Sequence, residues 1–149
     1  MAVNLEYAGR QYPPSEPYVV SREKLRDFAE AVAATNPVHF DPAAAQEQGY
    51  RDIVATPTFA VVVAQKTEHQ YIADPEAGVD FSRVVHAEER FSYTRPIVAG
   101  DELISVLHVD SLTERGGLAM VSTRVEISDA DGAPVATVHS TLAVRGADK

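Results

Sequence analysis

The sequence predicts an α+β domain in which a buried helix is wrapped by a curved antiparallel sheet. Helix-capping residues and helical periodicity fill the first half of the 149-residue chain, and strand-like segments separated by glycine turns fill the second. A strongly apolar helix needs a sheet face against which it can be buried. Because the chain is long enough for one such core, we expect a single domain over residues 1–149.

The first predicted helix begins after Ser21 and covers residues 22–33. Ser21 is a favourable N-cap residue. Apolar residues then recur at the i, i+3, i+4 and i+7 positions of one helix face, at Leu25, Phe28, Ala29 and Val32. The helix is expected to pack by this face and to deliver residues 34–39 to a loop at its end.

Two further helix starts follow. Asp41-Pro42 has the pattern of an N-cap and a first-turn proline, and it predicts a short helix that Gly49 ends. Thr56-Pro57 is a similar start signal, followed by an almost entirely apolar run over residues 58–66. Three consecutive valines in this run favour a strand, whereas the proline and the continuation toward Ile72 favour a helix. We interpret the run as the buried helix.

The second half of the chain predicts an antiparallel meander. The expected strands cover residues 83–94, 102–113, 118–128 and 135–145. Gly116-Gly117 and Asp131-Gly132 suit tight hairpin turns between the last three, because glycine tolerates the positive φ that such turns require.

Composition argues against several classes of function. Thirteen Lys and Arg oppose 22 Asp and Glu, and a formal net charge of -9 repels nucleic-acid backbones and anionic membranes. No stretch reaches the roughly 18 apolar residues of a membrane helix, and the N-terminus lacks a secretory pattern. We therefore expect a cytoplasmic protein that binds neither nucleic acid nor membrane. The absence of Cys excludes disulfides and thiolate chemistry.

No motif predicts a metal or a cofactor. The His residues lack metal-site spacing, and the sequence contains neither a serine-hydrolase elbow nor a phosphate-binding glycine loop. We expect no metal and no cofactor.

Residues 33–39 carry the first of two motif matches. They read Ala-Ala-Thr-Asn-Pro-Val-His and follow a predicted helix. The stretch resembles the Gly-Asp-x-Asn-Pro-aliphatic-His motif of the MaoC-like (R)-specific enoyl-thioester hydratase and dehydratase family. Four family features are kept, at Asn36, Pro37, Val38 and His39.

The second match spans residues 91–103 and is the more specific one. It looks like the family's strand, Arg-Pro, Gly-Asp turn and next strand, here with Arg95-Pro96 and Gly100-Asp101. Together with the order of the elements, the two matches extend over nearly the whole chain. The resemblance implies the hotdog fold, a role in fatty acid metabolism, and a ligand that is an acyl-CoA or acyl-carrier-protein thioester.

The resemblance also implies a catalytic pair, of which half is missing. In the family an Asp and a His hold the water that is added or removed, because one group handles the water and another the proton of the α-carbon. His39 occupies the His position, but Ala34 occupies the Asp position. Glu30 and Asp41 are the nearby carboxylates, although a solvated helix charge and an N-cap are the simpler interpretations of them.

A second departure concerns the start of the central helix. There the family aims a backbone N–H, usually of Gly, at the thioester carbonyl. Alignment places Pro57 at that position, which has no N–H, while Thr58 and Phe59 offer the next amides. Ala34, Pro57, Thr58 and Phe59 are therefore the expected substrate-binding residues.

Two hypotheses remain open. The chain resembles the non-catalytic hotdog units of the superfamily, which suggests a substrate-binding subunit that pairs with a catalytic one. Alternatively, it is a self-sufficient hydratase or dehydratase in which His39 is the base and Asn36 pins the loop or holds the water. Exposed sheet edges favour a dimer in either case, a homodimer or a heterodimer with another hotdog subunit.

Overall fold

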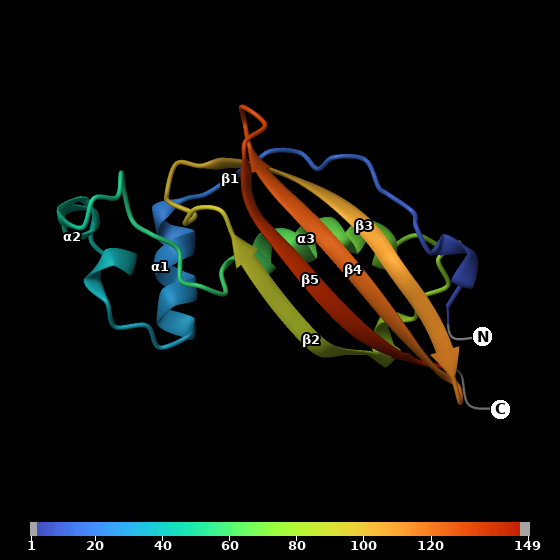
Figure 1. Ribbon diagram of the computed structural model, residues 1–149. Coiled ribbons are helices and arrows are strands. Elements are labelled where there is room, and N and C mark those ends of the chain that lie inside the picture. Colours follow the sequence, from blue (N-terminus) through green and yellow to red (C-terminus); the bar gives the residue numbers. More distant parts are fainter. Residues whose placement is uncertain (1–2, 147–149) are drawn as a thin grey trace.

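The computed structural model describes residues 3–146 and confirms the predicted hotdog fold (Figure 1). A central helix, α3 (Ala60–Ile72), lies against one face of a curved antiparallel sheet. The strands are β1 (Tyr18–Val19), β2 (Val84–Tyr93), β3 (Glu102–Arg115), β4 (Leu118–Asp129) and β5 (Pro134–Arg145). Their order in the sheet is β1-β3-β4-β5-β2, so that β2 forms one edge.

The long strands follow the predicted meander. From Leu103 to Val109, β3 alternates between buried and partly exposed residues, which places one of its faces against α3. Gly116, Gly117 and Gly132 have φ values of +61°, +78° and +85°, so both predicted hairpin turns are confirmed. The strands enclose α3 within one large buried cluster of apolar side chains.

The central apolar run is a helix, as predicted, but it begins three residues later than Pro57 suggested. The N–H of Phe59 donates to the carbonyl of Thr56 at 3.0 Å, so residues 56–59 form a turn before the helix. Phe59 is fully buried, and its ring lies edge-on to Phe28 at 5.5 Å between centroids. The capping pattern predicted the first turn of the helix at these residues. They instead form a separate turn in which the ring of Phe59 is buried.

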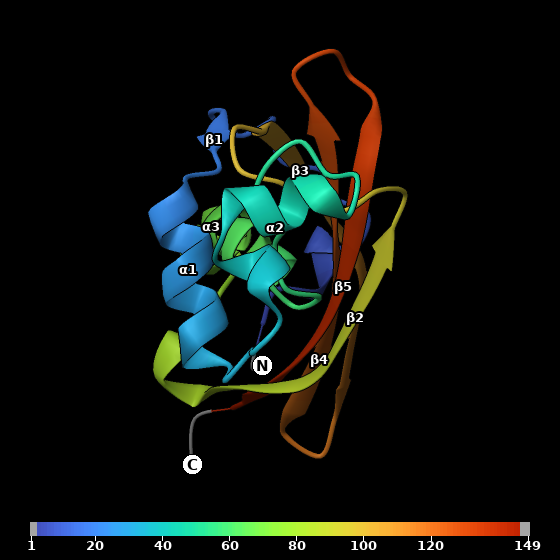
Figure 2. The same cartoon turned by 90° about the vertical axis from the view of Figure 1, so that its left-hand side faces the viewer.

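Two shorter helices lie near the end of the molecule where α3 begins (Figures 1 and 2). α1 (Arg22–Ala31) is capped by Ser21, whose hydroxyl accepts from the N–H of Lys24 at 3.1 Å. α2 (Pro42–Glu47) is capped by Asp41, which accepts from the N–H of Ala43 at 3.0 Å. Both predicted caps are confirmed, although α1 ends two residues before the predicted residue 33.

The sequence did not predict how residues 5–19 would fold. They include a short 3-10 helix, η1 (Leu5–Tyr7), and then run along β3, with the N–H of Tyr12 donating to the carbonyl of Leu107 at 2.9 Å. Strand β1 continues this pairing for two residues. Within residues 3–146, no helix combines the length and the apolar character that crossing a membrane requires.

Candidate functional site

A cavity of about 490 Å³ opens beside the start of α3. Three segments line it: the loop after α1, the turn before α3, and the connection that follows β2. The lining residues are Asn36, Val38, His39, Tyr50, Val54, Ala55, Thr56, Pro57, Tyr93, Thr94, Arg95, Pro96 and Ile97. The two motif stretches of the sequence thus meet at one cavity.

A hydrogen bond from its imidazole ring orients His39 in this cavity. Its Nδ1 lies 2.7 Å from the carbonyl oxygen of Val54, which only accepts, so Nδ1 carries the hydrogen. In the neutral ring the lone pair then belongs to Nε2, the atom that remains free to accept a proton. A backbone ladder supports the arrangement, because the N–H of Val54 donates to the carbonyl of Val38 at 3.0 Å. The imidazole is therefore oriented as a hydrogen-bond acceptor or base.

Asn36 shapes the loop that presents this ring. Its side-chain oxygen accepts from the N–H of Val38 at 3.1 Å and caps the 3-10 helix η2 (Pro37–His39). The preceding Ala33 has a φ of +58°, a left-handed conformation that favours glycine, the residue of the family motif at this position. The loop thus begins with a residue that is less favourable for this backbone conformation than the glycine of the family motif.

The turn before α3 contributes two polar groups. The Oγ1 of Thr56 is buried and, among the described residues, has no hydrogen-bond partner. The hydroxyl of Tyr93 donates to the carbonyl of Pro57, which holds the end of β2 against this turn. Burial raises the pKa of Tyr93, so its hydroxyl stays protonated near neutral pH.

The structure brings together only some of the sequence-predicted site residues. Asn36, His39 and Pro57 line the cavity, whereas Ala34 does not and gives its N–H to the carbonyl of Ala29 at 2.9 Å. Thr58 is exposed outside the lining, and Phe59 is buried in the core with its N–H bonded in the preceding turn.

No carboxylate of the described residues lines the cavity. Glu30 is exposed on α1, and the carboxylate of Asp41 is engaged as the cap of α2. The two substitutes that the sequence suggested therefore stand outside the cavity. Its titratable side chains are His39, Tyr50, Tyr93 and Arg95, of which Arg95 stays charged in its ion pair with Asp101.

The Arg95–Asp101 pair forms the frame of the connection after β2. Asp101 is 5% exposed and accepts from Arg95 at 2.8 Å, from Arg51 at 3.1 Å and from the N–H of Val98 at 2.9 Å. Burial by itself would raise the pKa of Asp101, but these donors hold it below its usual value. The sequence predicted a turn at Gly100-Asp101, and the ion pair between Arg95 and the buried Asp101 explains why the motif contains Arg and Asp.

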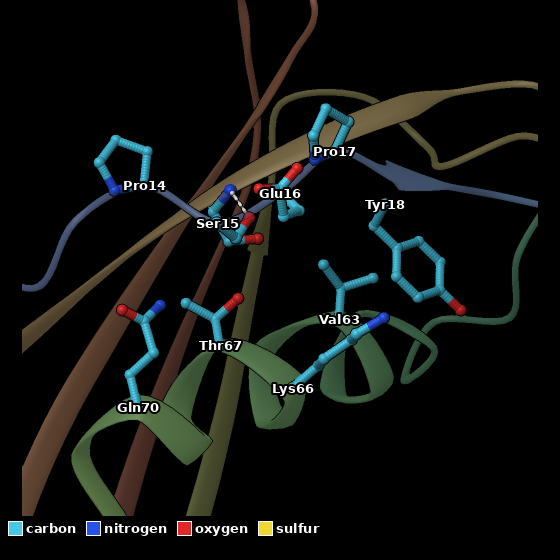
Figure 3. Close-up of a pocket in the computed structure, with 10 residues that line it drawn as sticks. Pro14, Ser15, Glu16, Pro17, Tyr18, Val63, Lys66, Thr67 and Gln70 are labelled. Carbon is cyan, nitrogen blue, oxygen red and sulfur yellow. Dashed lines mark hydrogen bonds between the residues drawn. The ribbon is translucent and has the colours of Figure 1, made fainter. Parts of the chain in front are cut away.

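A second cavity, of about 330 Å³, lies between residues 14–18, α3 and β3 (Figure 3). Thr67 and Lys66 of α3 face the N-terminal segment there, and the N–H of Ser105 donates to the hydroxyl of Ser15 at 2.9 Å. Its lining includes no imidazole, so the cavity at His39 is the better candidate for acid–base chemistry. Among the described residues, no group of three or more His, Asp or Glu is arranged to hold a metal.

Comparison with known proteins identifies the family. A family model described as the FAS1-like dehydratase domain region matches residues 6–138. The chain belongs to this dehydratase-region family. A UPF0336 protein of Leifsonia xyli subsp. xyli is 53% identical over 144 residues, which cover 97% of each chain.

Solved structures agree with the family. The C-terminally truncated HadBC complex of Mycobacterium tuberculosis, a 3R-hydroxyacyl-ACP dehydratase, matches with a TM-score of 0.83 and 31% identity over 92% of this chain and 96% of that one. A MaoC-like dehydratase matches with a TM-score of 0.88 and 34% identity over 97% of this chain and 44% of the other. The predicted MaoC-like character of the family is confirmed.

Proposed function

We propose that this chain is the acyl-thioester-binding, catalytically incomplete subunit of an (R)-3-hydroxyacyl-thioester dehydratase. One observation carries the proposal: the cavity beside α3 is lined by the imidazole of His39 but by no carboxylate of the described residues. Adding or removing water across the α and β carbons needs two proton-handling groups. A second hotdog subunit with the intact Asp-x-Asn-x-x-His loop would supply the complete pair.

The cavity has the character expected of an acyl-thioester pocket. Val38, Val54 and Ile97 give it apolar walls for an acyl chain, and the hydroxyl of Thr56 offers a hydrogen bond to a polar group of the ligand. The family resemblance supports the substrate class, and the HadBC match, a complex by its name, supports a partner subunit.

Measuring hydration of a trans-2-enoyl-CoA tests the proposal. The purified chain alone should be inactive, and co-expression with a hotdog subunit that carries the intact loop should give a stable, active heteromer. A Val38→Trp substitution, which narrows the cavity, should raise the KM of the heteromer several-fold with little effect on kcat, because it acts on acyl binding. Full activity of the chain alone, or failure to associate, would overturn the proposal.

The second candidate is a self-sufficient hydratase that uses His39. The hydrogen bond from Nδ1 to Val54 favours it, because this bond fixes the tautomer that a general base needs. In that case the wild-type chain alone hydrates enoyl-CoA, and His39→Gln abolishes the rate. Ala34→Asp would then raise the rate further by restoring the family's carboxylate.

A further inference from the structure

A second polar cluster lies farther along α3, between side chains of this helix and of the edge strand β2. Its centre is Glu68, which is 1% exposed. A cavity of about 230 Å³ adjoins it between α3 and the start of β2, lined by Gln65, Glu68, His69, Ile72, Phe81 and His86. We call this cavity, together with the neighbouring Glu89 of β2, the Glu68 recess.

The two carboxylates of the recess have few hydrogen-bond donors. The hydroxyl of Thr123 on β4 lies 3.4 Å from Glu68 Oε1, and the hydroxyl of Ser140 on β5 donates to Glu89 Oε2 at 2.8 Å. Among the described residues, Glu89 Oε1 is buried without a hydrogen-bond partner. His86 Nε2 is 3.7 Å from that oxygen, beyond hydrogen-bond distance.

The recess also lacks a permanent positive charge. Within residues 3–146, neither carboxylate forms an ion pair with Lys or Arg. Besides each other, the titratable groups that face them are His69 and Tyr71 from α3 and His86 from β2. Burial and the charge of Glu89 raise the pKa of Glu68 to about 7. A buried carboxylate must either be paired with a cation or take up a proton.

The recess lies beside an unpaired sheet edge. β2 pairs with β5 on one side, and its other side has no strand among the described residues. Phe81 and Val85, at the start of this edge, are 69% and 66% exposed. An edge with free backbone groups and exposed apolar side chains is suited to pairing with another chain.

We propose that the Glu68 recess receives a Lys or Arg side chain from a partner subunit that docks along the β2 edge. One cationic head group between Glu68 and Glu89 would satisfy the orphaned Glu89 Oε1 and give charge-assisted hydrogen bonds to both carboxylates. The inference rests on the proposed function, which requires a partner subunit. A second copy of this chain fits less well, because its net charge of -9 opposes self-association.

The experiment measures the dissociation constant of the heteromer formed with a hotdog subunit that carries the intact loop. Glu68→Gln and Glu89→Gln keep the shape of the side chain and remove its charge, and each should weaken association on the order of 10- to 100-fold. Glu88→Gln is the matched control, because Glu88 neighbours Glu89 on β2 but is exposed and does not line the recess. It should leave the affinity unchanged.

Calorimetry at pH 6 in two buffers of different ionisation enthalpy gives a second measurement. If a cation displaces the proton of Glu68, wild-type association should release about one proton, and Glu68→Gln association should release none. Thermal unfolding of each isolated variant checks that it is folded. If Glu68→Gln does not fold, the affinity of Glu89→Gln provides the test, because the Glu89 side chain is only partly buried.

The outcomes separate the two proposals. No association of the wild-type chain would overturn both this inference and the proposed function. Association that is insensitive to both Gln variants and releases no proton would overturn the docking cation alone. A homodimer that Glu68→Gln dissociates would show that the occupant is a second copy of this chain and would contradict the partner named here.

Discussion

The start of α3 and its later turns differ in the kind of polar group they present. Near the start, His39 and Thr56 line a cavity that has no carboxylate among the described residues. Farther along, Glu68 is buried and Glu89 is partly buried, and within residues 3–146 neither has a Lys or Arg partner. The described residues give the first region a base without a carboxylate, and the second region carboxylates without a Lys or Arg partner. In the two proposals above, a partner subunit completes each region.

The missing carboxylate near His39 and the missing cation near Glu68 differ in their cost to stability. His39 sits on a loop at an open cavity, where water can satisfy the free Nε2, so the missing carboxylate costs little stability. Glu68 lies between a helix and a sheet, and its charged form is costly there. The role of the His39 cavity can therefore be tested by measuring activity. The role of the buried Glu68 can be tested by measuring stability and association with a partner.

The largest predicted effect sharpens this contrast with a third carboxylate, Asp101, which is buried but fully paired. Asp101→Asn should lower the free energy of unfolding by about 3–5 kcal/mol, because it leaves Arg95 without its buried partner. Urea denaturation measures the loss. Asp27→Asn on the exposed side of α1 is the control and should change stability by less than about 0.5 kcal/mol. A similar small effect at Asp101 would show that burial of the pair does not stabilise the connection.

A pH series should show an effect of opposite sign for Glu68. Its folded-state pKa of about 7 is raised, so the folded state binds more protons and loses stability as pH rises toward 7. Glu68→Gln should remove this loss, making the variant more stable than wild type by up to about 3 kcal/mol at pH 8 and by little at pH 4. Urea midpoints across this range measure it. If the urea midpoints of wild type and Glu68→Gln depended on pH in the same way, the raised pKa of Glu68 would be contradicted.

The smallest effect concerns the loop that carries His39. Ala33→Gly should stabilise the chain by about 0.5–1 kcal/mol. Alanine has a steric cost at the positive φ of this position, and relief of that cost outweighs the larger unfolded-state entropy of glycine. Thermal denaturation detects this gain. Ala34→Gly, at the adjacent position without a positive φ, is the control and should destabilise the chain. Destabilisation by both substitutions would show that the loop is not strained at Ala33.

Local signals in the sequence were sufficient for most of the fold. Ser21 and Asp41 cap the helices that they predicted, and the two glycine turns join the expected strands. These features depend on hydrogen bonds and φ angles within a few residues of one another, so the local sequence is sufficient to predict them. The motif stretches likewise predicted which loop would bring Asn36 and His39 to a cavity.

Tertiary structure decided the contacts between distant segments. No local pattern indicated that Val54 would orient the ring of His39, that Tyr93 would hold the turn at Pro57, or that Thr58 would lie outside the cavity. Nor did any local pattern indicate that Glu68 of the helix and Glu89 of the edge strand would share a recess. Such pairings depend on how a helix rotates against a sheet and on strand register, which are set by packing of the whole core rather than by neighbouring residues.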